Sequence, residues 1–146
     1  MLGIETLHHV SLPVRDLQRS ITFYEGVLGL TPMARPPFDF EGRWYAVGDR
    51  SLHLIAASDD PTPTLREGKP IDSRDTHFAF RVASYARAVA YLESKGFRAS
   101  TDRNPMPTRD NPRPMRLSPA GLAGFPQIYV LDPDHNVIEI NAATLD

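Results

Sequence analysis

The chain has 146 residues, of which 41% are hydrophobic and 23% charged, and its formal net charge is −2. These values are typical of one globular domain and exclude collagen, coiled coils and disordered chains. Cysteine is absent, so disulfides and thiolate chemistry are excluded. Without a basic excess or a run of about 20 apolar residues, we expect neither nucleic acid nor a membrane as a partner. The first residues do not resemble a signal peptide, so we expect a cytoplasmic location.

The first third of the chain predicts one strand, one helix and three further strands. Residues 7–14 alternate between apolar and polar types, which is the period of a half-buried strand. A helix follows, with Asp16 as a suitable N-cap and Gly29 as a suitable stop. The remaining strands are expected over residues 30–35, 43–48 and 51–57.

Strand parity places polar side chains of this module on one face of its sheet. In the first strand, His9 and Ser11 point away from the apolar face that packs beneath the helix. In the last strand, His53 lies on the face opposite Leu52 and Leu54. We therefore expect both histidines on the helix-free face.

The rest of the chain predicts a linker and a second module of the same kind. Residues 58–75 are polar and hold three prolines, which indicates a linker. A strand over 76–82 and a helix over 85–95, capped by Ser84, come next. Further strands are expected over 97–101, 126–131 and 136–142. The proline- and arginine-rich segment 102–126 is long for a compact domain, and is either a lid or a surface excursion.

The two modules form an internal repeat. A shift of 68 residues places His9 on His77, and a shift of 86 residues places His53 on Glu139. The glycines that end the two helices also correspond. We therefore expect residues 1–146 to form one domain made of two βαβββ modules. The first module spans residues 1–57 and the second spans residues 76–146.

The repeat places ionisable side chains on equivalent faces of two sheets. If the modules pair about a pseudo-twofold axis, the sheets enclose a cavity on which these side chains converge. Imidazole and carboxylate ligands suit Fe²⁺, Zn²⁺, Ni²⁺, Co²⁺ or Mn²⁺. His9, His77 and Glu139 form a two-histidine, one-carboxylate set that leaves positions open for a substrate. His8, of opposite parity, and His135, in a solvated turn, are expected outside the cavity.

Four segments resemble the vicinal oxygen chelate superfamily, which includes glyoxalase I, bleomycin-resistance proteins, fosfomycin-modifying enzymes and extradiol dioxygenases. They are HHVSLPVRDLQRSITFYEGVLGL, LHLI, THFAF and YVLDPDHNVIEI. The resemblance implies an α+β fold in which two βαβββ modules pair into a curved sheet around a divalent metal. It places the metal ligands at His9, His77 and Glu139, and the metal would chelate vicinal oxygens of a small substrate.

Position 53 separates the reactions of this superfamily. Glyoxalase I has a second glutamate there, whereas His53 is either a fourth ligand or an acid–base group. Extradiol dioxygenases resemble the chain in a second-sphere histidine and in a tyrosine before the terminal glutamate, here Tyr129. Both lyase or isomerase chemistry and dioxygenase chemistry therefore remain open, with His53, Tyr129 and Glu139 as the expected catalytic residues.

The expected substrate is a small molecule that is anionic or aromatic. Its expected contacts are Ser11, Trp44, Arg81 and Asn141. Phe38 and Phe40 either line an apolar pocket beside Trp44 or pack in the core. The alternative function is metal-free sequestration of a drug-like small molecule. Two open sheets leave an apolar edge to bury, so we expect a homodimer.

Overall fold

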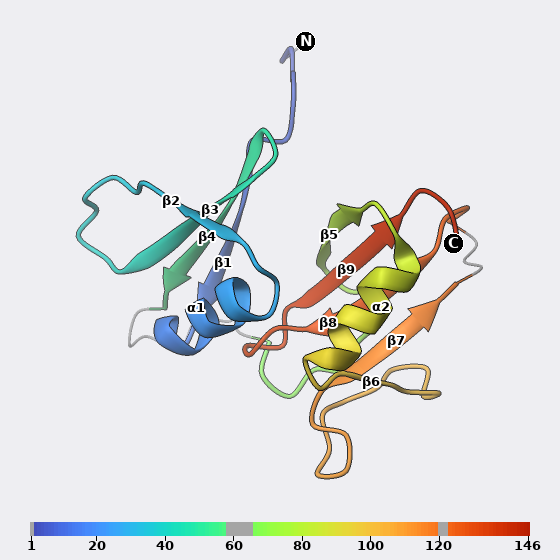
Figure 1. The fold of residues 1–146 in the computed structure, drawn as a ribbon. Coiled ribbons are helices and arrows are strands. Elements are labelled where there is room, and N and C mark those ends of the chain that lie inside the picture. The colour runs from blue at the N-terminus through green and yellow to red at the C-terminus, as the bar shows by residue number, and fades with distance from the viewer. Residues whose placement is uncertain (1, 58–65, 120–122) are drawn as a thin grey trace. The chain divides into compact units, whose positions relative to one another are not determined.

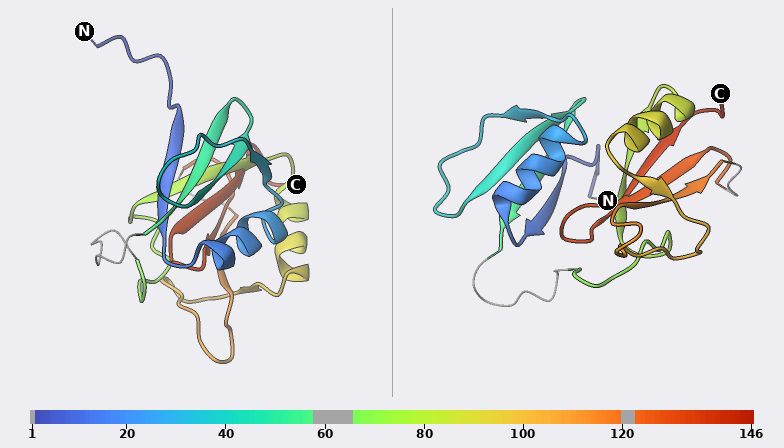
Figure 2. Two further views of the ribbon diagram at one scale, coloured as in Figure 1. Left: turned by 90° about the vertical axis from the view of Figure 1, so that its left-hand side faces the viewer. Right: turned by 60° about the horizontal axis from the view of Figure 1, so that its bottom comes forward.

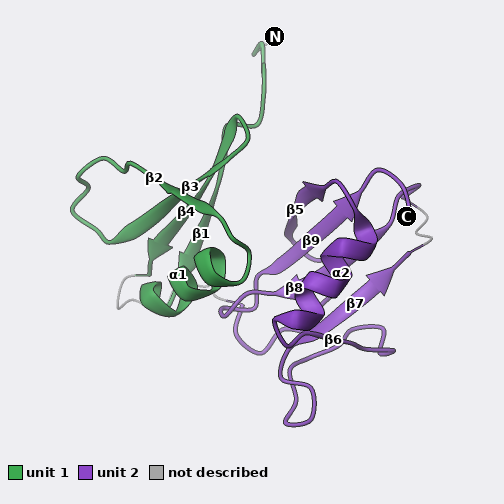
Figure 3. Cartoon of the chain, in the orientation of Figure 1, with its two compact units in different colours: residues 1–65 green, residues 66–146 purple. Residues whose placement is uncertain are grey.

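The computed structural model describes residues 2–57, 66–119 and 123–146. The chain divides into two compact units, Met1–Leu65 and Arg66–Asp146 (Figure 3). Each unit is a mixed sheet with one helix, which confirms the expected α+β class (Figure 1). None of the described helices is long and apolar enough to cross a membrane.

Unit 1 has the expected order of one strand, one helix and three strands. Its elements are β1 (His9–Val14), α1 (Leu17–Gly26), β2 (Thr31–Met33), β3 (Gly42–Val47) and β4 (Arg50–Ala56). The helix begins after Asp16, whose side chain accepts a hydrogen bond from the Arg19 amide at 2.9 Å and so satisfies a free donor of the first turn. Gly29 follows the helix with a φ of 70°, a conformation that favours glycine.

The sheet of unit 1 has the order β1-β4-β3-β2, so its first and last strands are neighbours and run parallel. Helix α1 covers one face of this sheet (Figure 2). Tyr24 from the helix and Tyr45, Leu52 and Leu54 from the sheet are buried between the two layers. His53, between two core leucines in sequence, therefore points to the opposite face, as parity predicts.

Unit 2 repeats this arrangement around β5 (His77–Val82), α2 (Tyr85–Ser94), β8 (Gln127–Leu131) and β9 (Val137–Ala142). Ser84 caps α2 by accepting a hydrogen bond from the Arg87 amide at 3.1 Å. With β6 (Arg98–Ala99) and β7 (Pro114–Ser118), the sheet has the order β5-β9-β8-β7-β6, and β5 again runs parallel to the last strand.

The segment 102–126 contains a strand that the sequence interpretation missed. Strand β7 (Pro114–Ser118) pairs with β8, in the position that β2 holds beside β3 in unit 1. Residues 97–101 were expected to fill that position, but β6 (Arg98–Ala99) is only a short parallel edge outside β7. The proline content of the segment predicted a loop instead of a strand. Pro114 is nevertheless compatible with β7, because it is the first residue of the strand, where a missing amide hydrogen is tolerated.

The described part of the expected linker belongs to unit 2. Residues 58–65 lie outside the described residues, whereas 66–75 pack against the second sheet. Ile71 is fully buried with Tyr129, Leu131 and Val137, and its amide donates to the carbonyl of Pro105 at 3.0 Å. This segment therefore covers part of the sheet face that also carries Glu139.

Candidate functional site

The helix-free face of unit 1 carries three stacked rings. The His53 imidazole stacks on the Trp44 indole, with ring centroids 3.8 Å apart and planes 5° apart. It also stacks on His9, with centroids 4.5 Å apart. Neighbouring strands create this arrangement, because β4 pairs with both β1 and β3, and His53 lies across from Trp44 in the register.

His53 is only 6% exposed, and its surroundings favour the neutral imidazole. Burial lowers the pKa of His53, and the nearby charges of His9 and His8 lower it further. The Ser51 hydroxyl lies 2.9 Å from Nε2 of His53 and forms a hydrogen bond with it. A neutral, oriented imidazole of this kind is suited to accept a proton at neutral pH.

A cavity of about 580 Å³ opens beside these rings. Its apolar wall consists of Met33, Phe38, Phe40, Trp44 and Ile55. The two phenylalanines, whose role the sequence left open, stack on each other at 5.1 Å and line this cavity with Trp44. A pocket with an apolar wall and a few polar groups is the usual form of a small-molecule site.

The sequence predicted that His8 lies outside the cavity, and this prediction is wrong. His8 lines the cavity together with His9, and the Nδ1 atoms of the two rings are 2.9 Å apart. The parity argument failed because β1 begins only at His9, so residue 8 does not follow strand alternation. Ser11 lies across from His53 in the register but is not part of the cavity lining.

The site residues of unit 2 centre on a buried carboxylate. Glu139 is 4% exposed, and burial alone would raise its pKa. Three hydrogen-bond donors and a nearby imidazole outweigh burial and hold the pKa of Glu139 below its ordinary value. In order of effect, they are Asn141, Gln127, Tyr129 and His77. The carboxylate is therefore ionised at neutral pH, as a metal ligand must be.

Tyr129 lies directly across from Glu139 in the pairing of β8 with β9. Burial, together with the hydrogen bond to Glu139 and its negative charge, raises the pKa of Tyr129 to about 12. Its ring meets His77 edge-on, with centroids 6.0 Å apart. The hydroxyl therefore keeps its proton and donates hydrogen bonds at neutral pH.

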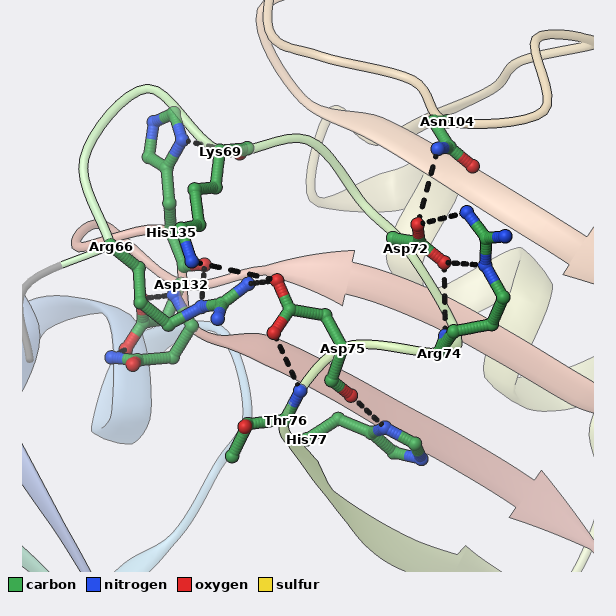
Figure 4. Close-up of polar contacts among 11 residues, drawn as sticks. Arg66, Lys69, Asp72, Arg74, Asp75, Thr76, His77, Asn104, Asp132 and His135 are labelled. Atoms are coloured by element: carbon green, nitrogen blue, oxygen red, sulfur yellow. Dashed lines mark hydrogen bonds and ion pairs between the residues drawn. The ribbon is translucent and has the colours of Figure 1, made fainter.

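His77 presents one ring nitrogen to Glu139 and the other to the backbone. Nδ1 lies 2.7 Å from the carbonyl oxygen of Asp75 (Figure 4). Because a carbonyl oxygen only accepts, Nδ1 carries the hydrogen, and the free electron pair of the neutral ring is on Nε2. Nε2 lies 3.5 Å from Oε2 of Glu139, so the contact is an ion pair when the ring is protonated and brings two electron-pair donors together when the ring is neutral.

The spacing and chemistry of this pair fit a divalent metal. Two ligand atoms about 2.1 Å from one ion at a tetrahedral angle are about 3.4 Å apart. The separation of 3.5 Å between His77 and Glu139 is close to that value. Among the residues that the structure describes, no group of three or more such side chains is placed to hold a metal. By itself, each unit thus carries part of the expected ligand set.

The two remaining substrate contacts expected from the sequence differ in their surroundings. The Arg81 guanidinium is exposed and lies over the Phe125 ring, 5.0 Å from its centroid. Asn141 donates to Glu139, and its buried Oδ1 has no hydrogen-bond partner in the described structure. Asn141 therefore supports the carboxylate of Glu139 while one of its own buried acceptors stays unpaired in the described structure.

The sequence interpretation missed three residues that surround the unit 2 pair. Gln127 faces Asn141 across the register and bonds Glu139, and strand alternation offered a signal for it. Arg116 lies over the Tyr129 ring at 5.8 Å, on the strand that was not predicted. Asp75 acts through its backbone carbonyl, which has no signature in the sequence.

His135, which the sequence predicts to lie in a solvated turn, is partly exposed and also contacts the backbone of the segment before β5. Its Nδ1 is 2.9 Å from the carbonyl of Lys69, and its own φ is 63°, in the left-handed region. It lies in unit 2, in the turn before β9 (Figure 4).

The duplicated βαβββ unit, with imidazole and carboxylate donors on its strands, defines the class of this protein. The model of the Glyoxalase/Bleomycin resistance protein/Dioxygenase superfamily matches residues 6–140. "Glyoxylase I 4" of Arabidopsis thaliana is 31% identical over 141 residues, which cover 95% of this chain and 71% of the relative. The chain therefore belongs to the glyoxalase/bleomycin resistance protein/dioxygenase superfamily.

Solved structures share this fold at low sequence identity. A structure described as a glyoxalase family protein from Bacillus anthracis has a TM-score of 0.70 at 18% identity, and covers 97% of this chain and 98% of its own. A variant of the fosfomycin resistance protein FosX from Listeria monocytogenes has a TM-score of 0.64 at 15% identity, with coverages of 97% and 95%. It was solved with Mn(II) and 1S,2S-dihydroxypropylphosphonic acid.

Proposed function

We propose that this protein is a divalent-metal-dependent enzyme that chelates vicinal oxygens of a small substrate, for lyase or isomerase chemistry of the glyoxalase type or for extradiol cleavage. The observation that carries the proposal is the facing pair of His77 Nε2 and Glu139 Oε2. An imidazole nitrogen and an ionised carboxylate at this spacing can both bind one divalent cation between them. His9, which coincides with His77 in the repeat, is the third proposed ligand.

The two units would supply different parts of the chemistry. A bound divalent metal would act as a Lewis acid on the chelated substrate oxygens. The neutral His53 imidazole would accept or return a proton at the substrate, and the Tyr129 hydroxyl would donate a hydrogen bond. The aromatic wall beside Trp44 would hold an apolar or aromatic group and exclude water. Ser11, Arg81 and Asn141 would contact polar or anionic substrate groups.

Metal analysis of the purified full chain tests the proposal directly. We expect one divalent ion per chain, and a fall in the thermal midpoint after chelation that the same ion reverses. The proposal is wrong if the protein holds no stoichiometric metal after incubation with Fe²⁺, Zn²⁺, Ni²⁺, Co²⁺ and Mn²⁺ and its thermal midpoint does not change on chelation. That result would favour metal-free sequestration of a small molecule.

Two assays then separate the reactions. Oxygen uptake with catechols on the Fe²⁺-loaded protein is the outcome for extradiol cleavage. Conversion of methylglyoxal with glutathione on the Ni²⁺- or Zn²⁺-loaded protein is the outcome for glyoxalase chemistry. His53 is common to both, as the proposed acid–base group.

We also propose that the chain forms a homodimer. The exposed Met33, Phe38 and Phe40 are supporting features, because large apolar side chains are usually covered. Native mass spectrometry measures the assembly. Mixing His9→Ala with Glu139→Gln chains then locates the ligand set. If each site draws on two chains, about a quarter of wild-type metal binding returns, because about half of the dimers contain one chain of each variant and each of these has one intact site of two. If each chain builds its own site, none returns.

A further inference from the structure

Arg66 is a buried arginine that bridges the segments leading into the two ligand-bearing strands of unit 2. Its side chain is 10% exposed. Nη2 donates to Oδ2 of Asp75 at 2.7 Å, and Nε donates to the carbonyl oxygen of His135 at 3.1 Å (Figure 4). Asp75 stands two residues before β5, and His135 stands two residues before β9. One guanidinium therefore forms hydrogen bonds to the segments that precede both strands.

The carboxylate of Asp75 is fixed from two directions. Arg66 bonds Oδ2, and the Thr76 amide donates to Oδ1 at 2.7 Å. A side chain held at both oxygens restricts the rotation of its own backbone. The carbonyl of the same residue is the acceptor for Nδ1 of His77, also at 2.7 Å. The direction of that carbonyl therefore depends on the Arg66–Asp75 pair.

We propose that Arg66 is a positioning residue for the proposed metal ligands His77 and Glu139, an inference that rests on the function proposed above. By fixing the Asp75 carbonyl, Arg66 holds the hydrogen of His77 on Nδ1 and turns Nε2 toward Glu139. By bonding the turn before β9, the same guanidinium also fixes the position of the strand that carries Glu139. Partners that orient a ligand in this way commonly change metal affinity by about 10- to 100-fold when they are removed.

Arginine suits this role better than lysine. The planar guanidinium has several donors in fixed directions, so it bonds a carboxylate and a carbonyl at once. Lys69 provides the contrast within the same segment. Its ammonium is 3.9 Å from Oδ2 of Asp75, but its side chain is 56% exposed, so it adds little to the geometry.

The test compares Arg66→Met with Lys69→Met in the full chain. Metal-free protein, at about pH 8.5 where an ordinary histidine is neutral, is examined by long-range ¹H–¹⁵N NMR of the imidazole nitrogens. The His77 signals are assigned by their loss in His77→Gln. We expect a single Nδ1–H tautomer in wild type and in Lys69→Met, and averaged tautomer signals in Arg66→Met. Zn²⁺ affinity should fall at least about tenfold in Arg66→Met and stay within about twofold in Lys69→Met.

The outcomes are distinct for this inference and for the proposed function. If Arg66→Met is less stable but keeps the single tautomer and the Zn²⁺ affinity, Arg66 is merely structural and the inference is overturned. If wild type binds no metal yet the tautomer changes as expected, the proposed function fails while the positioning of His77 by Arg66 stands. Should Arg66→Met not fold, Arg66→Lys serves instead, because lysine lacks the two donor nitrogens that the guanidinium holds in fixed directions. An unchanged tautomer there also overturns the inference.

Discussion

Units 1 and 2 share the same order of strands and helix, yet their equivalent site residues have opposite surroundings. In unit 1, His53 is covered by aromatic rings and opens on a cavity with an apolar wall. In unit 2, Glu139 is covered by polar donors that keep it ionised. The repeat thus preserved the backbone positions, while the side chains around them specialised for different tasks.

This difference follows from what each buried group needs. Burial favours a neutral imidazole, and it lowers the pKa of His53 together with the nearby charges of His9 and His8. A buried carboxylate stays charged only when donors replace the lost water, as they do at Glu139. We therefore expect unit 2 to supply the larger part of the metal affinity, with His9 as the ligand from unit 1, and unit 1 to determine proton transfer and substrate fit.

The largest effect is expected from Glu139→Gln, which removes the charge from the acceptor pair of unit 2. Metal affinity should fall by more than about 100-fold, because the amide is a weak ligand and the partner of His77 is lost. Isothermal titration calorimetry with Zn²⁺ measures it. Glu93→Gln, on an exposed part of α2, is the matched control and should bind as wild type does. Metal binding by Glu139→Gln at wild-type strength would contradict the assignment.

The reciprocal variant, His53→Ala, should leave metal binding intact and reduce turnover. General acid–base groups contribute about 10²- to 10⁴-fold to rate, so we expect a loss in that range. Metal content and turnover are measured on the same preparation with whichever substrate the assays identify. Loss of the metal in His53→Ala would instead make His53 a ligand and remove the contrast between the units.

Trp44→Ala should have a smaller effect, on binding rather than on rate. Removing the indole opens the cavity wall and exposes His53, so KM should rise by about tenfold while the metal stays bound. The pKa of His53, followed by NMR, should move up toward its ordinary value as burial is relieved. Trp44→Phe keeps a stacked ring and is the control. An unchanged His53 pKa in Trp44→Ala would show that stacking does not set it.

The smallest effect concerns the ion pair that precedes β5. The hydrogen bond from Arg66 is the main cause that lowers the pKa of Asp75 to about 2. A carboxyl with a depressed pKa stabilises the fold above its unfolded pKa near 3.9, and this contribution disappears as the pH falls toward 2. In the presence of a chelator, the stability difference between wild type and Asp75→Asn should be constant above about pH 5 and shrink between pH 5 and 2. Urea unfolding at each pH measures it, and a constant difference across that range would exclude this linkage.

Much of the site was predictable because strand alternation and the repeat depend only on residue order. Parity placed His53 on the face opposite Leu52 and Leu54, as observed. The same reasoning failed for His8, which precedes the strand, and for β7, which lies in a proline-rich segment that the sequence predicts to be a loop. Backbone acceptors such as the Asp75 carbonyl depend on tertiary packing, so no pattern of side chains predicts them.

In each unit the first strand pairs in parallel with the last, and this has a consequence for how the protein is made. During synthesis, unit 1 can close its sheet once residue 56 has emerged, whereas β5 must wait for β9 at residues 137–142. Closing so long a loop is entropically costly and slow, since few contacts compensate for it before the strands meet. His77 and Glu139 therefore come together only after β9 has been synthesised, so the two proposed metal ligands of unit 2 meet late in folding.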